Sequence, residues 1–198
     1  ILSFEKPARY AASGDDLGRQ LASQGIGWTP LTFSKRYGKL GKLWDLIKMY
    51  GSAIRLQKQH RFGIIHCRSY LASQVGCLLK RIFGPKVIFD MRGLWVDERV
   101  DGGLWKMERL QDRLAYHLYK RIESRLLNCA DYVVTLTERS IPEIRKLAGP
   151  SWVPIVVIPC CADFDVLMPP TRLERERIRR VLGIGEADVV LAYLGSLG

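Results

Sequence analysis

Short runs of β-type residues alternate with amphipathic helical segments along the whole chain. Residues 86–90 and 154–158 are apolar runs of strand length, whereas residues 71–82 and 105–129 repeat apolar side chains every three or four positions. This alternation is typical of βαβ units, in which crossover helices join parallel strands. The sequence therefore predicts an α/β fold with a Rossmann-like parallel β-sheet flanked by helices.

Turn and capping residues set the expected boundaries. Strands are expected over residues 1–5, 28–33, 63–67, 86–90, 131–136, 154–158 and 189–193. Helices are expected over residues 15–24, 71–82, 105–129, 141–147 and 172–182, with another inside the basic stretch 35–61. Thr171 and Glu174 have the spacing of a capping box at the start of the last helix.

The character of the sequence changes after Pro159, where a loop with two adjacent prolines precedes a helix rich in Arg and Glu. We expect residues 1–168 to form an N-terminal Rossmann-like domain and residues 169–187 to form a linker with a short helix. Residues 188–198 are expected to be the first strand and glycine loop of a second domain that is cut short.

Composition is that of an ordinary soluble globular protein. The chain has 198 residues, of which 47% are hydrophobic and 26% are charged. No apolar run approaches the roughly 20 residues that cross a bilayer, and residues 1–5 lack the basic start of a secretion signal. These features favour a cytoplasmic location.

The net charge is strongly positive, at +11. Residues 1–61 contribute much of it, with eleven basic and four acidic residues, a net of +7. Such an excess suits an anionic partner, which could be a nucleotide, a nucleic acid or an acidic membrane surface. For the stretch 35–61, peripheral contact with the inner face of a membrane competes with a simple solvated helix face.

Cysteine usage indicates a reducing compartment. The five cysteines are odd in number and contain no C-x-x-C pair. We therefore expect neither a disulfide framework nor a zinc site, and the thiols are predicted to be reduced and structural.

Polar side chains stand where several expected strands end. Ligands of open parallel sheets bind beyond the carboxyl ends of the strands, so these side chains predict a shared cleft. They are Lys6, Arg68, Ser69, Asp90, Arg92, Glu138 and Asp163.

Residues 90–98 are the segment with the most reactive groups. Asp90 can accept a proton or a hydrogen bond from a sugar hydroxyl, and Arg92 can keep its carboxylate ionised. Trp95 offers a ring on which a sugar can stack. The alternative is an Asp90–Arg92 pair that fixes a turn, with Gly93 adopting a positive φ.

Two further features are ambiguous. His66 alternates with Ile65 and Cys67 in the third strand, so it is either a residue of the cleft or a hydrogen-bonded core histidine. Residues 11–16, ahead of the expected first helix, are small enough for a phosphate to approach a helix N-terminus. That segment contains two aspartates and no full G-x-G-x-x-G pattern, which disfavours the usual dinucleotide binding.

Several motifs together resemble the GT-B glycosyltransferases, in particular family 4. The motifs are Ile64-Ile-His66-Cys-Arg68-Ser69-Tyr70, Val87-Ile-Phe-Asp90-Met-Arg92-Gly93, Cys129-Ala-Asp131-Tyr-Val-Val-Thr-Leu-Thr-Glu138 and Val156-Val-Ile-Pro-Cys-Cys-Ala-Asp163. Cys160 and Cys161 depart from the V-I-P-N-G-V-D that the family usually has there. Residues 192–198 look like the first strand and glycine loop of the family's donor-binding domain. The resemblance covers essentially the whole chain, and the order and spacing of the motifs make it specific.

The resemblance implies a retaining transfer of a sugar from a nucleotide-diphosphate donor to a glycan or lipid-linked acceptor, without a catalytic metal or other cofactor. The acceptor lies mainly on the N-terminal domain of such proteins, and the donor mainly on the C-terminal one, so the present chain alone is not expected to turn over. Together with the polar residues at the strand ends, the resemblance implies catalytic roles for Asp90 and Arg92. The implied substrate-binding residues are Lys6, His66, Arg68, Ser69, Trp95 and Glu138, and the implied donor-binding residues are Gly195, Ser196 and Gly198.

Two other classes of protein remain as alternatives. A non-catalytic basic module that binds nucleic acid or an acidic membrane predicts exposed aromatics interleaved with Arg, whereas most aromatics here fall in expected strands and helix cores. Another Rossmann-type nucleotide-sugar enzyme, such as an epimerase or reductase, predicts a glycine fingerprint after the first strand, where residues 6–14 contain only Gly14. We therefore expect no nucleic-acid partner, and the sequence leaves the oligomeric state open.

Overall fold

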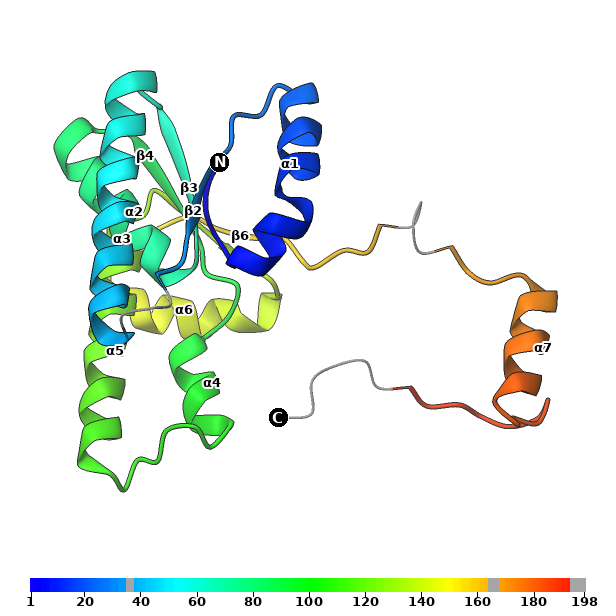
Figure 1. The fold of residues 1–198 in the computed structure, drawn as a ribbon. Coiled ribbons are helices and arrows are strands. Elements are labelled where there is room, and N and C mark those ends of the chain that lie inside the picture. Colours follow the sequence, from blue (N-terminus) through cyan, green and yellow to red (C-terminus); the bar gives the residue numbers. More distant parts are fainter. Residues whose placement is uncertain (35–37, 164–167, 193–198) are drawn as a thin grey trace. The chain divides into compact units, whose positions relative to one another are not determined.

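The computed structural model describes residues 1–34, 38–163 and 168–192, with residues 38–40 by their backbone alone. Its strands pair in parallel and form two sheets (Figure 1). In the first sheet, β1 (Leu2–Glu5) pairs with β2 (Thr29–Thr32). In the second, the order is β3 (Ile64–Arg68), β4 (Lys86–Asp90), β5 (Tyr132–Thr135) and β6 (Ile155–Val157). The predicted α/β fold with parallel strands is confirmed, but the strands are divided between two sheets.

Helices connect the successive strands, as βαβ units require. They are α1 (Pro7–Ser23), α2 (Gly38–His60), α3 (Ser69–Phe83), α4 (Trp95–Asp101), α5 (Leu110–Cys129), the short 3₁₀ helix η2 (Glu138–Ser140), α6 (Ile141–Ala148) and α7 (Arg172–Val181). Contacts place α3 against β3 and β4, and α5 against α3 and α6.

Two predictions about helices are wrong. α1 begins at Pro7, whose fixed φ suits the first turn of a helix, so residues 11–16 lie inside the helix. The helix predicted over residues 105–129 begins only at Leu110, as α5, and the separate helix α4 before it was not predicted. Gly103, just after α4, has a φ of 70°, which an L-residue rarely adopts, and the chain turns there before α5 begins.

The core of the four-stranded sheet lies between the strands and the helices α3, α5 and α6. Phe89 and Val133 from the strands, Leu127 from α5 and Ile144 from α6 are all almost completely buried. Full burial of each such side chain contributes about 1.5–3 kcal/mol. A second cluster joins Met49 of α2 to α3 and to the apolar side chains of β1. Residues far apart in the sequence are therefore held together by apolar contact from several elements.

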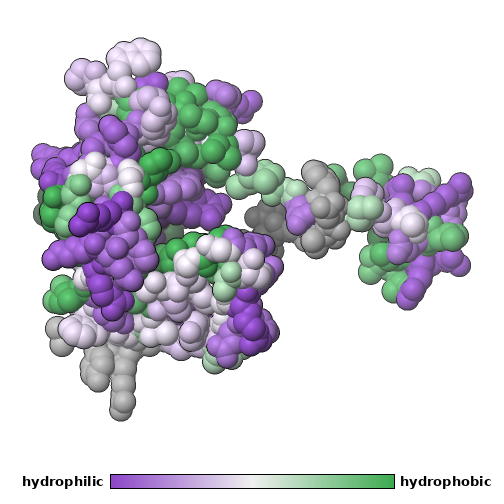
Figure 2. All heavy atoms as spheres, turned by 90° about the horizontal axis from the view of Figure 1, so that it is seen from above, coloured by the Kyte–Doolittle hydropathy of each residue, from purple (hydrophilic) through white to green (hydrophobic). Residues whose placement is uncertain are grey.

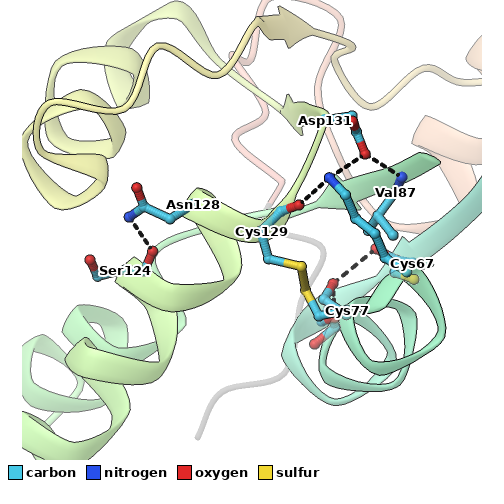
Figure 3. The surroundings of a disulfide bond; sticks show 10 residues. Cys67, Cys77, Val87, Ser124, Asn128, Cys129 and Asp131 are labelled. Atoms are coloured by element: carbon cyan, nitrogen blue, oxygen red, sulfur yellow. Dashed lines mark hydrogen bonds and ion pairs between the residues drawn. A yellow bond between two sulfur atoms is a disulfide. The ribbon is translucent and has the colours of Figure 1, made fainter. Parts of the chain in front are cut away.

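The amino end of the sheet is fixed by one carboxylate and by a disulfide (Figure 3). Asp131 accepts hydrogen bonds from Lys80 Nζ at 2.7 Å, from Lys86 Nζ at 3.0 Å and from the backbone N–H of Val87 at 2.9 Å. These contacts outweigh the effect of burial and hold the pKa of Asp131 near 2. The amino ends of β4 and β5 are thereby joined to α3.

Cys77 of α3 and Cys129 of α5 form a disulfide, with Cα atoms 6.0 Å apart (Figure 3). The prediction that the cysteines are reduced is therefore wrong for this pair. The reason is tertiary, because α3 and α5 pack side by side and bring together residues 52 positions apart in the sequence. Cys67 is a free, buried thiol, and burial raises its pKa to about 11. Cys160 and Cys161 are both exposed.

The chain divides into two compact units, Ile1–Pro159 and Cys160–Gly198. Within the second unit, Thr171 and Glu174 form the predicted capping box at the start of α7. Residues 189–192 form no strand, so the strand predicted over residues 189–193 is wrong for its described part. Residue 193 and the glycine loop after it lie outside the described residues.

The surface mixes hydrophilic side chains with apolar patches, as Figure 2 shows from one side. Several large apolar side chains are more than half exposed, among them Leu43, Trp44 and Ile47 of α2. Among the helices of the described residues, none combines the length and the apolar composition needed to cross a membrane.

Candidate functional site at the carboxyl edge of the sheet

The carboxyl ends of β3 and β4 bring the central residues of the predicted cleft together. The parallel register places Arg68 opposite Asp90. His66 Nε2 lies 3.5 Å from Asp90 Oδ2, with the Asp90 side chain 15% exposed and that of His66 58% exposed. His66 is too exposed to be a core histidine, because the inward position next to it is taken by the buried Cys67, and its role as a residue of the cleft stays a prediction. Asp90 is thus a shielded carboxylate with an accessible imidazole beside it.

The turns that follow these strands both contain a left-handed residue. Ser69, directly after β3, has a φ of 74°, and Arg92, two residues after β4, has a φ of 51°. Each such conformation costs an L-residue about 1–2 kcal/mol, and residues of this kind gather at functional sites. The positive φ expected at Gly93 belongs to Arg92 instead, and whether Asp90 pairs with Arg92 to fix the turn stays open. Gly93 instead leaves room for the Glu98 carboxylate, which a Cβ at this position would meet.

The other strand-end residues lie further along the edge. Glu138 is exposed and starts η2, three residues after the end of β5, the strand next to β4. Lys6 is also exposed and is the N-cap of α1, directly after β1 in the two-stranded sheet. The structure therefore brings His66, Arg68 and Asp90 into one group, and places Lys6 and Glu138 at the ends of other strands.

Trp95 lies in an aromatic cluster at the start of α4. Its ring centroid is 5.8 Å from that of Tyr70 and 5.3 Å from that of Tyr119. The guanidinium of Arg99 lies 4.2 Å from the centre of the Trp95 ring, a cation–π contact. The ring is half-buried by these neighbours, and its role in stacking on a sugar stays a prediction.

A mainly apolar cavity of about 760 Å³ adjoins this group. It is lined by residues of β1, the start of β2, α2, β3 and α3, and His66 and Arg68 are among its polar lining residues. No sequence pattern predicted it, because its walls come from five elements that are separate in the chain. The cavity gives the two residues an apolar neighbourhood on one side.

Two segments were considered for phosphate binding. Residues 11–16, where the sequence already disfavoured it, lie within α1 and away from its first turn, so they offer no helix N-terminus to a phosphate. Gly195, Ser196 and Gly198, predicted to bind the donor, lie outside the described residues.

The parallel sheet and the family comparison together define the class of protein. The family model for the glycosyl transferase 4-like domain matches residues 7–161, and the chain belongs to this family. The expected resemblance to family 4 GT-B glycosyltransferases is thereby confirmed.

Particular relatives are glycosyltransferases as well. The chain is 28% identical over 136 residues to a D-inositol 3-phosphate glycosyltransferase of Corynebacterium aurimucosum, covering 69% of this chain and 31% of the relative. It is 24% identical over 155 residues to the enzyme of the same name from Corynebacterium diphtheriae, covering 77% and 35%. The chain thus spans about a third of the length of these curated relatives.

A solved structure of similar fold is that of Anabaena HepE in complex with UDP and glucose. The TM-score is 0.53 at 18% identity, and the match covers 85% of this chain and 40% of that one. At this identity the likeness supports the fold alone.

Proposed function

We propose that the whole protein is a retaining glycosyltransferase that moves a sugar from a nucleotide-diphosphate donor to a glycan or lipid-linked acceptor, and that this chain supplies the acceptor side. The observation that carries the proposal is the His66–Asp90 pair at the carboxyl edge, 3.5 Å apart and next to Arg68. Nucleotide-sugar use is supported by family membership.

The chemistry proposed for this group is orientation and proton transfer at an acceptor hydroxyl. The Asp90 carboxylate accepts a hydrogen bond from the hydroxyl, which increases the electron density on the attacking oxygen. His66 beside it provides a second group that can carry the proton. Arg68 and Arg92 supply positive charge near the acceptor, which suits the phosphate in the substrate named for the relatives.

The donor belongs to the second domain in this proposal, where backbone N–H groups of Gly195 and Gly198 approach the diphosphate. The reaction needs no catalytic metal and no other cofactor, because charge on the leaving group is met by cations and dipoles of the protein. The enzyme acts in the cytoplasm, and the chain of 198 residues is inactive by itself.

Peripheral membrane contact is a second part of the proposal. The outward face of α2 exposes Leu43, Trp44 and Ile47, and Arg55 and Lys58 are also exposed further along the helix. Apolar side chains next to cations favour an anionic membrane surface, to which each Lys or Arg contributes about 1 kcal/mol. A lipid-linked acceptor would be presented there.

Calorimetric titration tests the division between donor and acceptor sides. UDP- and GDP-sugars are titrated into the full-length protein and into residues 1–198, and the full-length protein is then assayed for transfer to D-inositol 3-phosphate and to glycan acceptors. Binding by the full-length protein alone, with a product that keeps the anomeric configuration of the donor by NMR, supports the proposal. Tight binding of a nucleotide sugar by residues 1–198, or a product of inverted configuration, contradicts it.

A further inference from the structure

A carboxyl group is buried in the middle of α5. Glu123 is 0% exposed, and Lys120 Nζ lies 2.8 Å from its Oε2 atom. Burying a charge is unfavourable unless it is paired and hydrogen-bonded, and a buried ion pair is often replaceable by apolar residues without loss of stability. A contribution to stability is therefore a weak explanation for the burial of this ion pair. The other contacts of Glu123 indicate what else it does.

Glu123 is connected to both left-handed turns through one tyrosine. The Tyr70 hydroxyl donates a hydrogen bond to Glu123 Oε1 and lies 3.4 Å from the backbone oxygen of Gly93. Tyr70 directly follows Ser69, and Gly93 directly follows Arg92. A single buried hydroxyl thus stands next to the two turns that present the predicted site residues.

The second arm of the network reaches α4. Lys120 Nζ also lies 2.8 Å from Asp97 Oδ2, and Tyr116 donates a hydrogen bond of 3.0 Å to Asp97 Oδ1. Asp97 lies in the first turn of α4, the helix that begins just after the Arg92 turn. The network of Tyr70, Asp97, Tyr116, Lys120 and Glu123 therefore joins α3, α4 and α5 behind the carboxyl edge.

The protonation states that the network needs are stable near neutral pH. Burial raises the pKa of Tyr70, and its hydrogen bond to Glu123 raises it further, so the hydroxyl keeps the proton that it donates. Burial by itself would lower the pKa of Lys120, but its bonds to Asp97 and Glu123 outweigh that effect and the pKa is raised. Lys120 therefore stays charged between its two carboxylate partners.

We propose that Glu123 is a positioning residue, which acts through Tyr70 to hold the β3–α3 and β4–α4 turns and so to fix Ser69, Arg92 and Asp90 for the acceptor. Only the expected effect on catalysis rests on the proposed transferase activity, and the expected effect on the two turns does not. Strained backbone persists where its surroundings over-determine it. Here the contacts that hold the two strained turns come from their buried side.

The test uses the full-length protein with the variants Tyr70→Phe, which removes only the hydroxyl, and Glu123→Gln, which keeps an oxygen that can accept from it. Hydrogen exchange is followed by mass spectrometry in peptides that contain residues 69–70 and 92–93. Lys80→Met is the matched control, because it breaks a partly buried ion pair with Asp131 at the other end of the sheet. Tyr70→Phe should speed exchange at both turns by about tenfold, with a smaller change for Glu123→Gln and none for Lys80→Met.

Transfer kinetics supply the second readout. Tyr70→Phe should lower kcat about tenfold and leave the KM for the nucleotide sugar within about twofold, because the donor binds elsewhere. Unchanged exchange at the turns overturns the proposal whatever the activity, and so does faster exchange with an unaltered kcat. A stronger effect of Glu123→Gln than of Tyr70→Phe also overturns it, since Glu123 would then not act through Tyr70. A full-length protein with no transfer activity contradicts the proposed function instead, and the exchange rates still decide whether the network holds the turns.

Discussion

At the scale of single residues, the same side chain type has different roles at the two ends of the sheet. Asp90 at the carboxyl end has the exposed His66 beside it, whereas Asp131 at the amino end is surrounded by two lysines and a backbone N–H. Both side chains are 15% exposed, but the Asp131 carboxylate has its hydrogen-bonding capacity taken up by the fold, whereas Asp90 stands at the edge proposed for the acceptor. This contrast leads to opposite expectations for the two asparagine variants.

Asp90→Asn in the full-length protein should lower kcat for sugar transfer by at least about tenfold and leave Tm nearly unchanged. An amide cannot take up the hydroxyl proton, yet it has nearly the size and shape of the carboxyl group and keeps one oxygen that can accept a hydrogen bond. Steady-state kinetics and a thermal melt measure the two quantities, with Asp15→Asn in α1 as an exposed control. A loss of Tm as large as the loss of activity would mean that Asp90 is a turn residue.

Asp131→Asn should instead destabilise the fold in a pH-dependent way. The pKa of Asp131 is lowered from 3.8 to about 2 in the folded state, so its contribution is present above pH 4 and is lost as the pH falls toward 2. We expect a loss of about 1–2 kcal/mol at pH 7, after allowance for solvent screening of the lysines. Urea unfolding of residues 1–198 at pH 7, 4 and 3 measures it. A difference between wild type and variant that stays constant over this range would contradict the assignment.

At the scale of elements, α2 combines a buried face with an exposed apolar one. Met49, Ala53 and Gln57 point into the domain, whereas Leu43, Trp44 and Ile47 are more than half exposed. A helix with apolar residues on its outer face needs another surface to cover them, and the nearby Arg55 and Lys58 favour an anionic one.

Trp44→Ser should weaken sedimentation of the full-length protein with vesicles that contain phosphatidylglycerol by about tenfold, since a buried aromatic ring is lost from the membrane contact. Trp152→Ser is the matched control, because Trp152 is 86% exposed in the loop between α6 and β6. Binding should also fall with added salt and be weak on phosphatidylcholine vesicles. Equal effects of the two variants, or no binding by the wild type, would leave α2 as a solvated helix.

At the scale of the whole molecule, the apolar core and the candidate site both belong to the unit Ile1–Pro159. The second unit contributes the capped helix α7, which has no buried residue among those described. The family model ends at residue 161, close to the boundary between the units. Structural stability and the proposed acceptor side are therefore expected to reside in the first unit.

Residues 1–159 produced alone should fold and unfold cooperatively, with a Tm within about 5 °C of that of residues 1–198, because the apolar clusters are intact in both. Circular dichroism and calorimetry measure this. The comparison of the two chains is its own control. A shorter chain that is unfolded, or that melts without cooperativity, would show that residues after Pro159 complete the core.

Local pattern was sufficient for most of the fold. The strand predicted over residues 86–90 has the bounds of β4, and the capping box at Thr171 forms as its spacing indicates. Hydrophobic periodicity and capping are properties of a few consecutive residues, so they can be recognised without knowing what those residues contact. The convergence of His66, Arg68 and Asp90 followed from a general property of parallel sheets, that their carboxyl ends share one edge.

Tertiary structure alone decided which polar groups are buried and which residues they contact. Lys120 and Glu123 have the spacing of an ordinary surface pair on a helix, yet Glu123 is in the core beside Tyr70. Cys77 and Cys129 gave no sequence signal of pairing, and they meet because α3 and α5 lie side by side. The sequence by itself determined most of the strands and helices and the parallel pairing of the strands, and it indicated the edge at which the site is proposed. Burial, the disulfide and the left-handed turns depend on neighbours distant in the chain, and only the folded structure brings these together.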